Sequence, residues 1–149
     1  ELYNFPIIFS IHPRTKKQLN KIGIIPNDNI KFLDPLGFID YVALQKKSFL
    51  VLSDSGTISE EASILNFRAI NIRSSHERPE AMEEASVIMA DIKKGRILRA
   101  INSSITQSKT KRNFEKVNDY SFTNVSKKVE RIILSYTDYI NHNVWRKEF

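Results

Sequence analysis

The sequence contains no cysteine among its 149 residues, which excludes disulfide bonds and thiolate metal sites. It has no apolar run near the roughly 20 residues that span a bilayer, and its first residues do not form a cationic, apolar signal-peptide leader. The P-loop motif, the GxSxG motif of hydrolases and a metal-site spacing of histidine and acidic residues are all missing. We therefore expect a soluble, cytoplasmic protein with no metal, no cofactor and no membrane partner.

The net charge of +6 is the one compositional feature typical of nucleic-acid-binding proteins. The basic residues are spread over several segments, chiefly residues 14–21, 93–99 and 109–112, without stacking aromatics between them. No recognised nucleic-acid motif accompanies them. We interpret the charge as a solvated basic surface and expect no nucleic-acid partner.

The pattern of apolar runs predicts an α/β fold. A chain of 149 residues fits one domain with a proper core. Strand-like runs alternate with helical stretches up to residue 92, which favours a Rossmann-like parallel sheet with helices on both faces. The predicted strands are residues 5–11, 30–33, 49–52, 69–72 and 87–89, and the predicted helices between them are residues 14–22, 38–46, 58–66 and 79–85. We expect a single domain over residues 1–149.

Beyond residue 92 the sequence predicts helices only. Residues 92–105 form one helix, residues 107–122 a polar loop, and an apolar stripe at helical spacing runs over residues 125–140. The C-terminal helical segment is therefore expected from about residue 123. Because the sequence starts at Glu1 and not at a methionine, we expect it to be part of a longer protein.

The most informative segment is residues 53–61, which read S-D-S-G-T-I-S-E-E and follow an apolar strand. Thr57 and Glu60 have the T-x-x-E spacing of a capping box, so a helix is expected to open here. Free amides at a helix start, reached over Gly56 without an obstructing Cβ, form a site for an anion such as phosphate. Glu61 shares a helix face with Thr57 and leans back toward the helix start. A phosphate site beside a carboxylate indicates a nucleotide, although a well-capped structural helix would give the same pattern.

Polar residues follow four of the predicted strands, and in a parallel sheet these loops lie at the carboxyl edge, where ligands bind. Arg78 precedes Pro79, whose ring suits the first position of a helix. The guanidinium of Arg78 is therefore expected at the mouth of the site, where it could bind a diphosphate through two parallel hydrogen bonds. The alternative is a surface ion pair with Glu77 or Glu80. His12 ends the first strand and is a candidate for either a structural or a ligand-binding role.

Two strings in this sequence occur together in a known family. Residues 53–62 (S-D-S-G-T-I-S-E-E-A) and residues 76–81 (H-E-R-P-E-A) resemble the D-S-G-G-x-x-E-E and T-E-R-P-E runs of the non-hydrolysing UDP-N-acetylglucosamine 2-epimerase family. The similarity extends over nearly the whole chain. Thr57 in place of the second glycine resembles the branch that makes UDP-N-acetyl-L-fucosamine.

The resemblance implies the second domain of a glycosyltransferase-B-type fold, incomplete at its N-terminus. It implies that Ser55, Gly56 and Thr57 hold the diphosphate of a UDP-sugar, that Glu61 binds the ribose hydroxyls, and that Arg78 lies at the phosphates. The reaction it implies is elimination and re-addition of UDP across C1 and C2, which needs acid and base groups. In the family these groups belong largely to the first domain.

Three further residues take roles from the resemblance alone. Tyr41 stands where the family often has a phenylalanine near the uracil, and Leu36 where some members have glutamine. His12 matches a histidine that contacts a second, regulatory UDP-sugar in some members, and it is our only candidate for a catalytic base in this chain.

The sequence thus predicts the UDP-binding half of a UDP-sugar 2-epimerase, an isomerase of cell-surface polysaccharide biosynthesis, inactive on its own. The alternatives are a non-catalytic UDP-binding module from a truncated or split gene, and a domain of a glycosyltransferase. The expected partners are a UDP-sugar and either a second copy of the chain, in a homodimer, or a chain that supplies the first domain.

Overall fold

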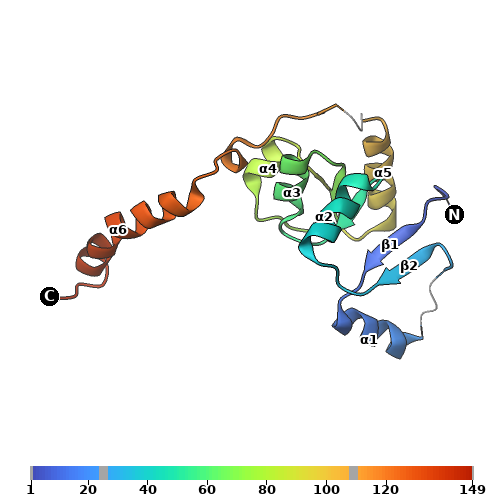
Figure 1. Cartoon of the computed structure of the whole chain (residues 1–149), viewed down its shortest axis with the longest axis horizontal. Coiled ribbons are helices and arrows are strands. Elements are labelled where there is room, and N and C mark those ends of the chain that lie inside the picture. Colours follow the sequence, from blue (N-terminus) through green and yellow to red (C-terminus); the bar gives the residue numbers. More distant parts are fainter. Residues whose placement is uncertain (1, 24–26, 108–110, 149) are drawn as a thin grey trace. The chain divides into compact units, whose positions relative to one another are not determined.

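The computed structural model describes residues 2–23, 27–107 and 111–148, and within these ranges strands and helices alternate as predicted (Figure 1). The first part of the chain contains β1 (Ile7–Ser10), α1 (Pro13–Ile22), β2 (Ile30–Leu33) and α2 (Phe38–Lys47). The second part contains β3 (Val51–Ser53), α3 (Ile58–Leu65), β4 (Ala69–Asn71), α4 (Pro79–Glu83), β5 (Ile88–Met89), α5 (Lys94–Ile105), a 3-10 helix η1 (Asn118–Tyr120) and α6 (Val125–Asn143).

All strand pairings among the described residues are parallel, which confirms the predicted α/β class. They form two ladders, one of β1 and β2 and one in the order β3–β4–β5. The chain divides into two compact units, Glu1–Phe49 and Leu50–Phe149, and each ladder lies in one of them. The prediction of a single domain over residues 1–149 stays a prediction.

In the second unit helices cover both faces of the sheet. Successive side chains of a strand point to opposite faces, and β4 illustrates this. Ala69 packs into a cluster with Ile58 and Ala62 of α3, whereas Ile70 packs with Ala100 of α5. All three residues of β4 are buried, as expected for a central strand of a parallel sheet.

The first unit is covered less completely. Ile7, Ile8 and Phe9 of β1 are 54%, 50% and 42% exposed, although their apolar run predicted burial on both faces. α1, the helix that follows β1, buries none of its residues either, so no fully packed apolar contact with this helix covers the strand. Ile11, directly after β1, is fully buried.

The segment predicted as a polar loop, residues 107–122, contains an ordered anchor. Residues 108–110 lie outside the described residues. Val117 is 1% exposed, and η1 follows it directly. One apolar residue in a polar stretch thus fixes this connection to the second unit.

The helix α6 begins at Val125 and buries none of its residues. The apolar stripe predicted over residues 125–140 lies on this helix, and Val125, Val129, Ile132, Ile133 and Tyr136 of it are exposed. Within the described ranges, no helix is both long enough and apolar enough to cross a bilayer.

Candidate anion site at the start of helix α3

The turn between β3 and α3 is held by side chains of small polar residues. The Oγ atom of buried Ser53, the last residue of β3, accepts a hydrogen bond from the amide of Ser55 at 3.1 Å. Thr57 is the residue before α3, and its amide donates to Oγ of Ser55 at 3.3 Å. These local bonds form because serine side chains easily reach backbone amides one or two residues away. They fix the turn that carries Gly56 at the carboxyl edge of the sheet.

The predicted capping box of Thr57 and Glu60 is wrong. No side chain caps α3, and Thr57 has φ −79° and ψ −6°, a helical conformation. A capping residue needs an extended backbone for its hydroxyl to reach the amides of the first turn. Glu60 instead pairs with Arg78, which lies directly before another helix. The first amides of α3 therefore receive no side-chain cap.

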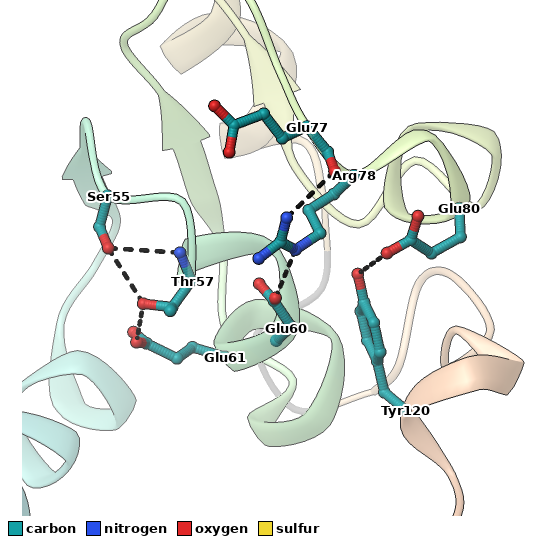
Figure 2. Close-up of polar contacts among 8 residues, drawn as sticks. All are labelled: Ser55, Thr57, Glu60, Glu61, Glu77, Arg78, Glu80 and Tyr120. Carbon is teal, nitrogen blue, oxygen red and sulfur yellow. Dashed lines mark hydrogen bonds and ion pairs between the residues drawn. The ribbon is translucent and has the colours of Figure 1, made fainter. Parts of the chain in front are cut away.

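Three side chains form a chain of contacts along this helix start (Figure 2). The Oγ1 hydroxyl of Thr57 donates to Oε1 of Glu61 at 2.7 Å. The Oγ atom of Ser55 lies 3.0 Å from Oγ1 of Thr57. Glu61 thus shares the face of Thr57, as predicted, and its carboxylate is oriented by that hydroxyl.

Gly56 leaves the turn open. A Cβ atom placed on Gly56 would have one neighbour within 4 Å, Nη1 of Arg73 at 3.8 Å. A ligand atom that approaches Gly56 therefore meets few protein atoms, and the nearest of them belongs to the guanidinium of Arg73. Arg73 also pairs with Glu77 at 3.6 Å.

Arg73 is a residue of this edge that sequence reasoning did not select as a site residue. Its place two residues after the end of β4 is the signal that could have identified it, because the carboxyl ends of parallel strands meet at one edge. A guanidinium next to an open glycine turn adds positive charge where an anion would bind.

Arg78 lies beside the same end of α3. It immediately precedes α4, and Pro79 takes the first helical position, as predicted. Its Nε donates to Oε1 of Glu60 at 2.6 Å, and its Nη1 donates to the backbone oxygen of Glu77 at 3.0 Å. The hydrogen bond to Glu60 raises the pKa of Arg78 further, so the guanidinium is cationic at every ordinary pH. The alternative interpretation of Arg78 was an ion pair with Glu77 or Glu80, and the structure forms an ion pair with Glu60 instead.

A second polar contact joins α4 to η1. The hydroxyl of Tyr120 donates to Oε1 of Glu80 at 2.7 Å (Figure 2). This hydrogen bond lowers the pKa of Glu80. Burial, followed by the bond to Glu80, raises the pKa of Tyr120. Sequence reasoning missed this pair, because Tyr120 lies in the polar stretch assigned to a loop.

The other predicted site residues belong to the first unit. His12 caps α1, since its Nδ1 accepts the amide hydrogen of Arg14 at 3.2 Å. Leu36 is half-buried in the turn before α2, and Tyr41 is half-buried in the first turn of α2. The roles expected of His12, Leu36 and Tyr41 remain predictions.

A contact joins α1 to the loop after β2 in the first unit. Nζ of Lys16 pairs with Oδ1 of Asp34 at 3.1 Å. Asp34 follows the carboxyl end of β2, and Lys16 lies in the first turn of the helix that follows β1. Both side chains are exposed, so the pair adds little to stability. Among the described residues, no group of three or more histidine, aspartate or glutamate side chains is arranged to hold a metal ion.

The fold and this edge define a parallel α/β protein with an open, cationic strand–turn–helix of the kind that binds anions. A sequence model described as UDP-N-acetylglucosamine 2-epimerase matches residues 1–134. The chain belongs to the UDP-N-acetylglucosamine 2-epimerase family.

Similar proteins agree with this membership. The UDP-N-acetylglucosamine 2-epimerase of Methanocaldococcus jannaschii is 36% identical over 117 residues, which cover 76% of this chain and 32% of the relative. The structure of the Rickettsia bellii enzyme of the same name is 50% identical, with a TM-score of 0.85, and the match covers 98% of this chain and 40% of that chain. The M. jannaschii structure in complex with UDP-GlcNAc and UDP is 33% identical, with a TM-score of 0.78, over 90% of this chain and 37% of that chain.

The chain therefore spans about a third to two fifths of the length of these relatives. The relatives have glycosyltransferase-B-type folds, of which this chain matches a part. The similarities do not distinguish the UDP-N-acetyl-L-fucosamine branch from the rest of the family.

Proposed function

We propose that this chain is the UDP-binding half of a UDP-sugar 2-epimerase. The observation that carries the proposal is the uncapped start of α3, with open Gly56 and with Arg73 and Arg78 beside it. A diphosphate requires amide donors and positive charge together. The M. jannaschii relative, whose structure is a complex with UDP-GlcNAc and UDP, supports the choice of a UDP-sugar.

In this proposal the turn residues Ser55, Gly56 and Thr57 present backbone amides to the diphosphate. Arg78 adds N–H donors at the phosphates. Glu61, oriented by the hydroxyl of Thr57, accepts hydrogen bonds from the ribose hydroxyls. Leu36 and Tyr41 are assigned to the uracil from the family resemblance.

The proposed reaction inverts C2 of a UDP-N-acetylhexosamine by elimination and re-addition of UDP. The groups of this chain bind and orient UDP as the leaving group and nucleophile, whereas proton removal at C2 needs a positioned base. We assign that base to the part of the relatives that this chain does not match. The exposed apolar stripe of α6 is the proposed contact surface for the chain that carries it or for a second copy.

The first test is titration of the chain with UDP by calorimetry. Arg78→Ala should lower the UDP affinity about ten- to a hundredfold, because a charged hydrogen-bond donor at the phosphates is lost. Arg99→Ala is the matched control, since it removes an exposed arginine from α5. Equal UDP affinities for the wild type and Arg78→Ala would contradict the assignment of Arg78.

The role of Glu61 has its own test. Glu61→Gln should reduce the discrimination between UDP and 2′-deoxy-UDP, because its proposed partner is a ribose hydroxyl. Equal losses of affinity for the two nucleotides would rule out this role.

The absence of a base from this chain is tested by isotope exchange. Incubation of the chain with UDP-N-acetylglucosamine in D₂O should give no deuterium at C2 by proton NMR, because general acid and base groups are needed for exchange there. Deuterium incorporation would place a catalytic base in this chain.

A further inference from the structure

Glu60 lies in the first turn of α3 and its carboxylate has a single partner among the described residues. Oε1 accepts the Nε hydrogen of Arg78 at 2.6 Å, and the Glu60 side chain is 26% exposed. Oε2 is buried, with no hydrogen-bond partner in the described part of the chain. A partly buried carboxylate needs a compensating cation. The placement of Glu60 therefore depends on Arg78.

Arg78 is in turn held by two contacts, one to a side chain of α3 and one to the backbone of the residue before it. Its guanidinium is planar, with five N–H donors in fixed directions. Nε is bound to Glu60, and Nη1 is bound to the backbone oxygen of Glu77. Nη2 has no hydrogen-bond partner within residues 2–23, 27–107 and 111–148. Figure 2 shows the guanidinium extending from the start of α4 to the first turn of α3, at the end that carries Thr57.

We propose that Glu60 is a positioning residue for diphosphate binding, which acts by holding the guanidinium of Arg78 over the start of α3. This inference rests on the proposed function. Two anchors determine the plane of the guanidinium, so the remaining N–H donors are already directed when the ligand arrives. An arginine that is ordered in advance loses less side-chain entropy on binding than one that moves freely.

The proposal opposes what charge alone predicts. Glu60 is negative and lies close to the site of an anionic ligand, so Coulomb repulsion predicts tighter binding when the charge is removed. Positioning predicts weaker binding, because Arg78 then keeps only a weaker, neutral hydrogen bond at Nε. The direction of the change in UDP affinity therefore separates the two explanations.

The experiment is calorimetric titration of the 149-residue chain and its variants with UDP. Glu60→Gln should weaken UDP binding about tenfold, since a neutral amide oxygen holds the Nε hydrogen of Arg78 less strongly than a carboxylate does. Glu60→Asp keeps the charge but is one methylene shorter, so it should weaken binding as well. In the Arg78→Ala background, Glu60→Gln should cause no further weakening. A merely structural role for Glu60 would weaken binding in both backgrounds.

Glu83→Gln is the matched control, because Glu83 is an exposed glutamate of α4 and the change in charge is the same. It should leave UDP affinity unchanged or slightly raise it. Glu60→Gln with wild-type or tighter UDP binding, or with equal weakening in the Arg78→Ala background, would overturn the positioning role and leave the proposed function standing. A wild-type chain that does not bind UDP would overturn both.

Discussion

The two units of this chain use similar elements but stabilise them differently. Each has parallel strands followed by helices. In the second unit α3 and α5 each pack against the central strand β4, and both clusters contain fully buried isoleucines. In the first unit β1 is exposed and α1 buries no residue. The proposed diphosphate site is thus built on the unit with the packed core, as a site that requires fixed geometry should be.

The largest expected effect compares one isoleucine from each unit. Ile70→Ala creates a cavity in the second unit and should lower the free energy of unfolding by about 2–5 kcal/mol. Ile7→Ala removes a side chain that is 54% exposed and should change it by about 0.5 kcal/mol or less. Urea unfolding followed by circular dichroism measures both. Similar losses for the two variants would show that β1 is packed as tightly as β4.

A smaller effect is expected where the chain after α5 joins the second unit. The buried Oγ atom of Ser63 accepts the amide hydrogen of Val117 at 2.9 Å, so Ser63→Ala leaves a buried amide without a partner. This should cost about 1–3 kcal/mol of unfolding free energy. Hydrogen exchange should also accelerate at the Val117 amide. Ser103→Ala, at an exposed position of α5, is the control, and an unchanged Val117 exchange rate would contradict the anchor.

The smallest expected effect concerns the hydrogen bond between Tyr120 and Glu80, and it depends on pH. Tyr120→Phe should lower the free energy of unfolding at pH 7 by about 1 kcal/mol. The bond lowers the pKa of Glu80, so its contribution is present above the ordinary value of 4.5 and is lost as the pH falls through the lower folded value. The pKa of Tyr120 is raised, so that contribution is present below the ordinary value of 10.0 and is lost as the pH rises further.

The difference in stability between the wild type and Tyr120→Phe should therefore be largest between these two ordinary values. Chemical denaturation over a pH series measures it. If the difference in unfolding free energy stays constant as the pH falls far below 4.5, protonation of Glu80 does not weaken this hydrogen bond.

The elements of the fold were largely predictable from sequence, because apolar runs and turn residues act locally. β2 was predicted with its observed bounds, and Pro79 marked the start of α4. Which groups the polar side chains bind by hydrogen bonds and ion pairs was not predictable from sequence. The capping box failed because Thr57 is helical and Glu60 binds an arginine 18 residues away. The partner of Glu60 is determined by how α3 and the start of α4 pack together, and the spacing of residues along the chain does not predict this packing.

Two residues that connect α3 and α4 to the segment after α5 were also not predictable from sequence. Ser63 and Tyr120 bind groups 54 and 40 residues away in sequence. A serine in an amphipathic helix and a tyrosine in a polar stretch have ordinary local explanations. Their roles follow only when α3, α4 and η1 are placed together. Arg73, by contrast, was accessible from the rule that places strand ends at one edge.

The cap on helix α1 has a consequence for proton chemistry at His12. Because Nδ1 accepts the amide hydrogen of Arg14, the neutral imidazole carries its proton on Nε2. In this tautomer Nε2 is a donor, suited to a negatively charged oxygen. To accept a proton at Nε2, the ring must first move its hydrogen to Nδ1, and that tautomer cannot accept from Arg14. Any turnover in which His12 acts as a base would therefore break this cap on α1 and restore it in every cycle.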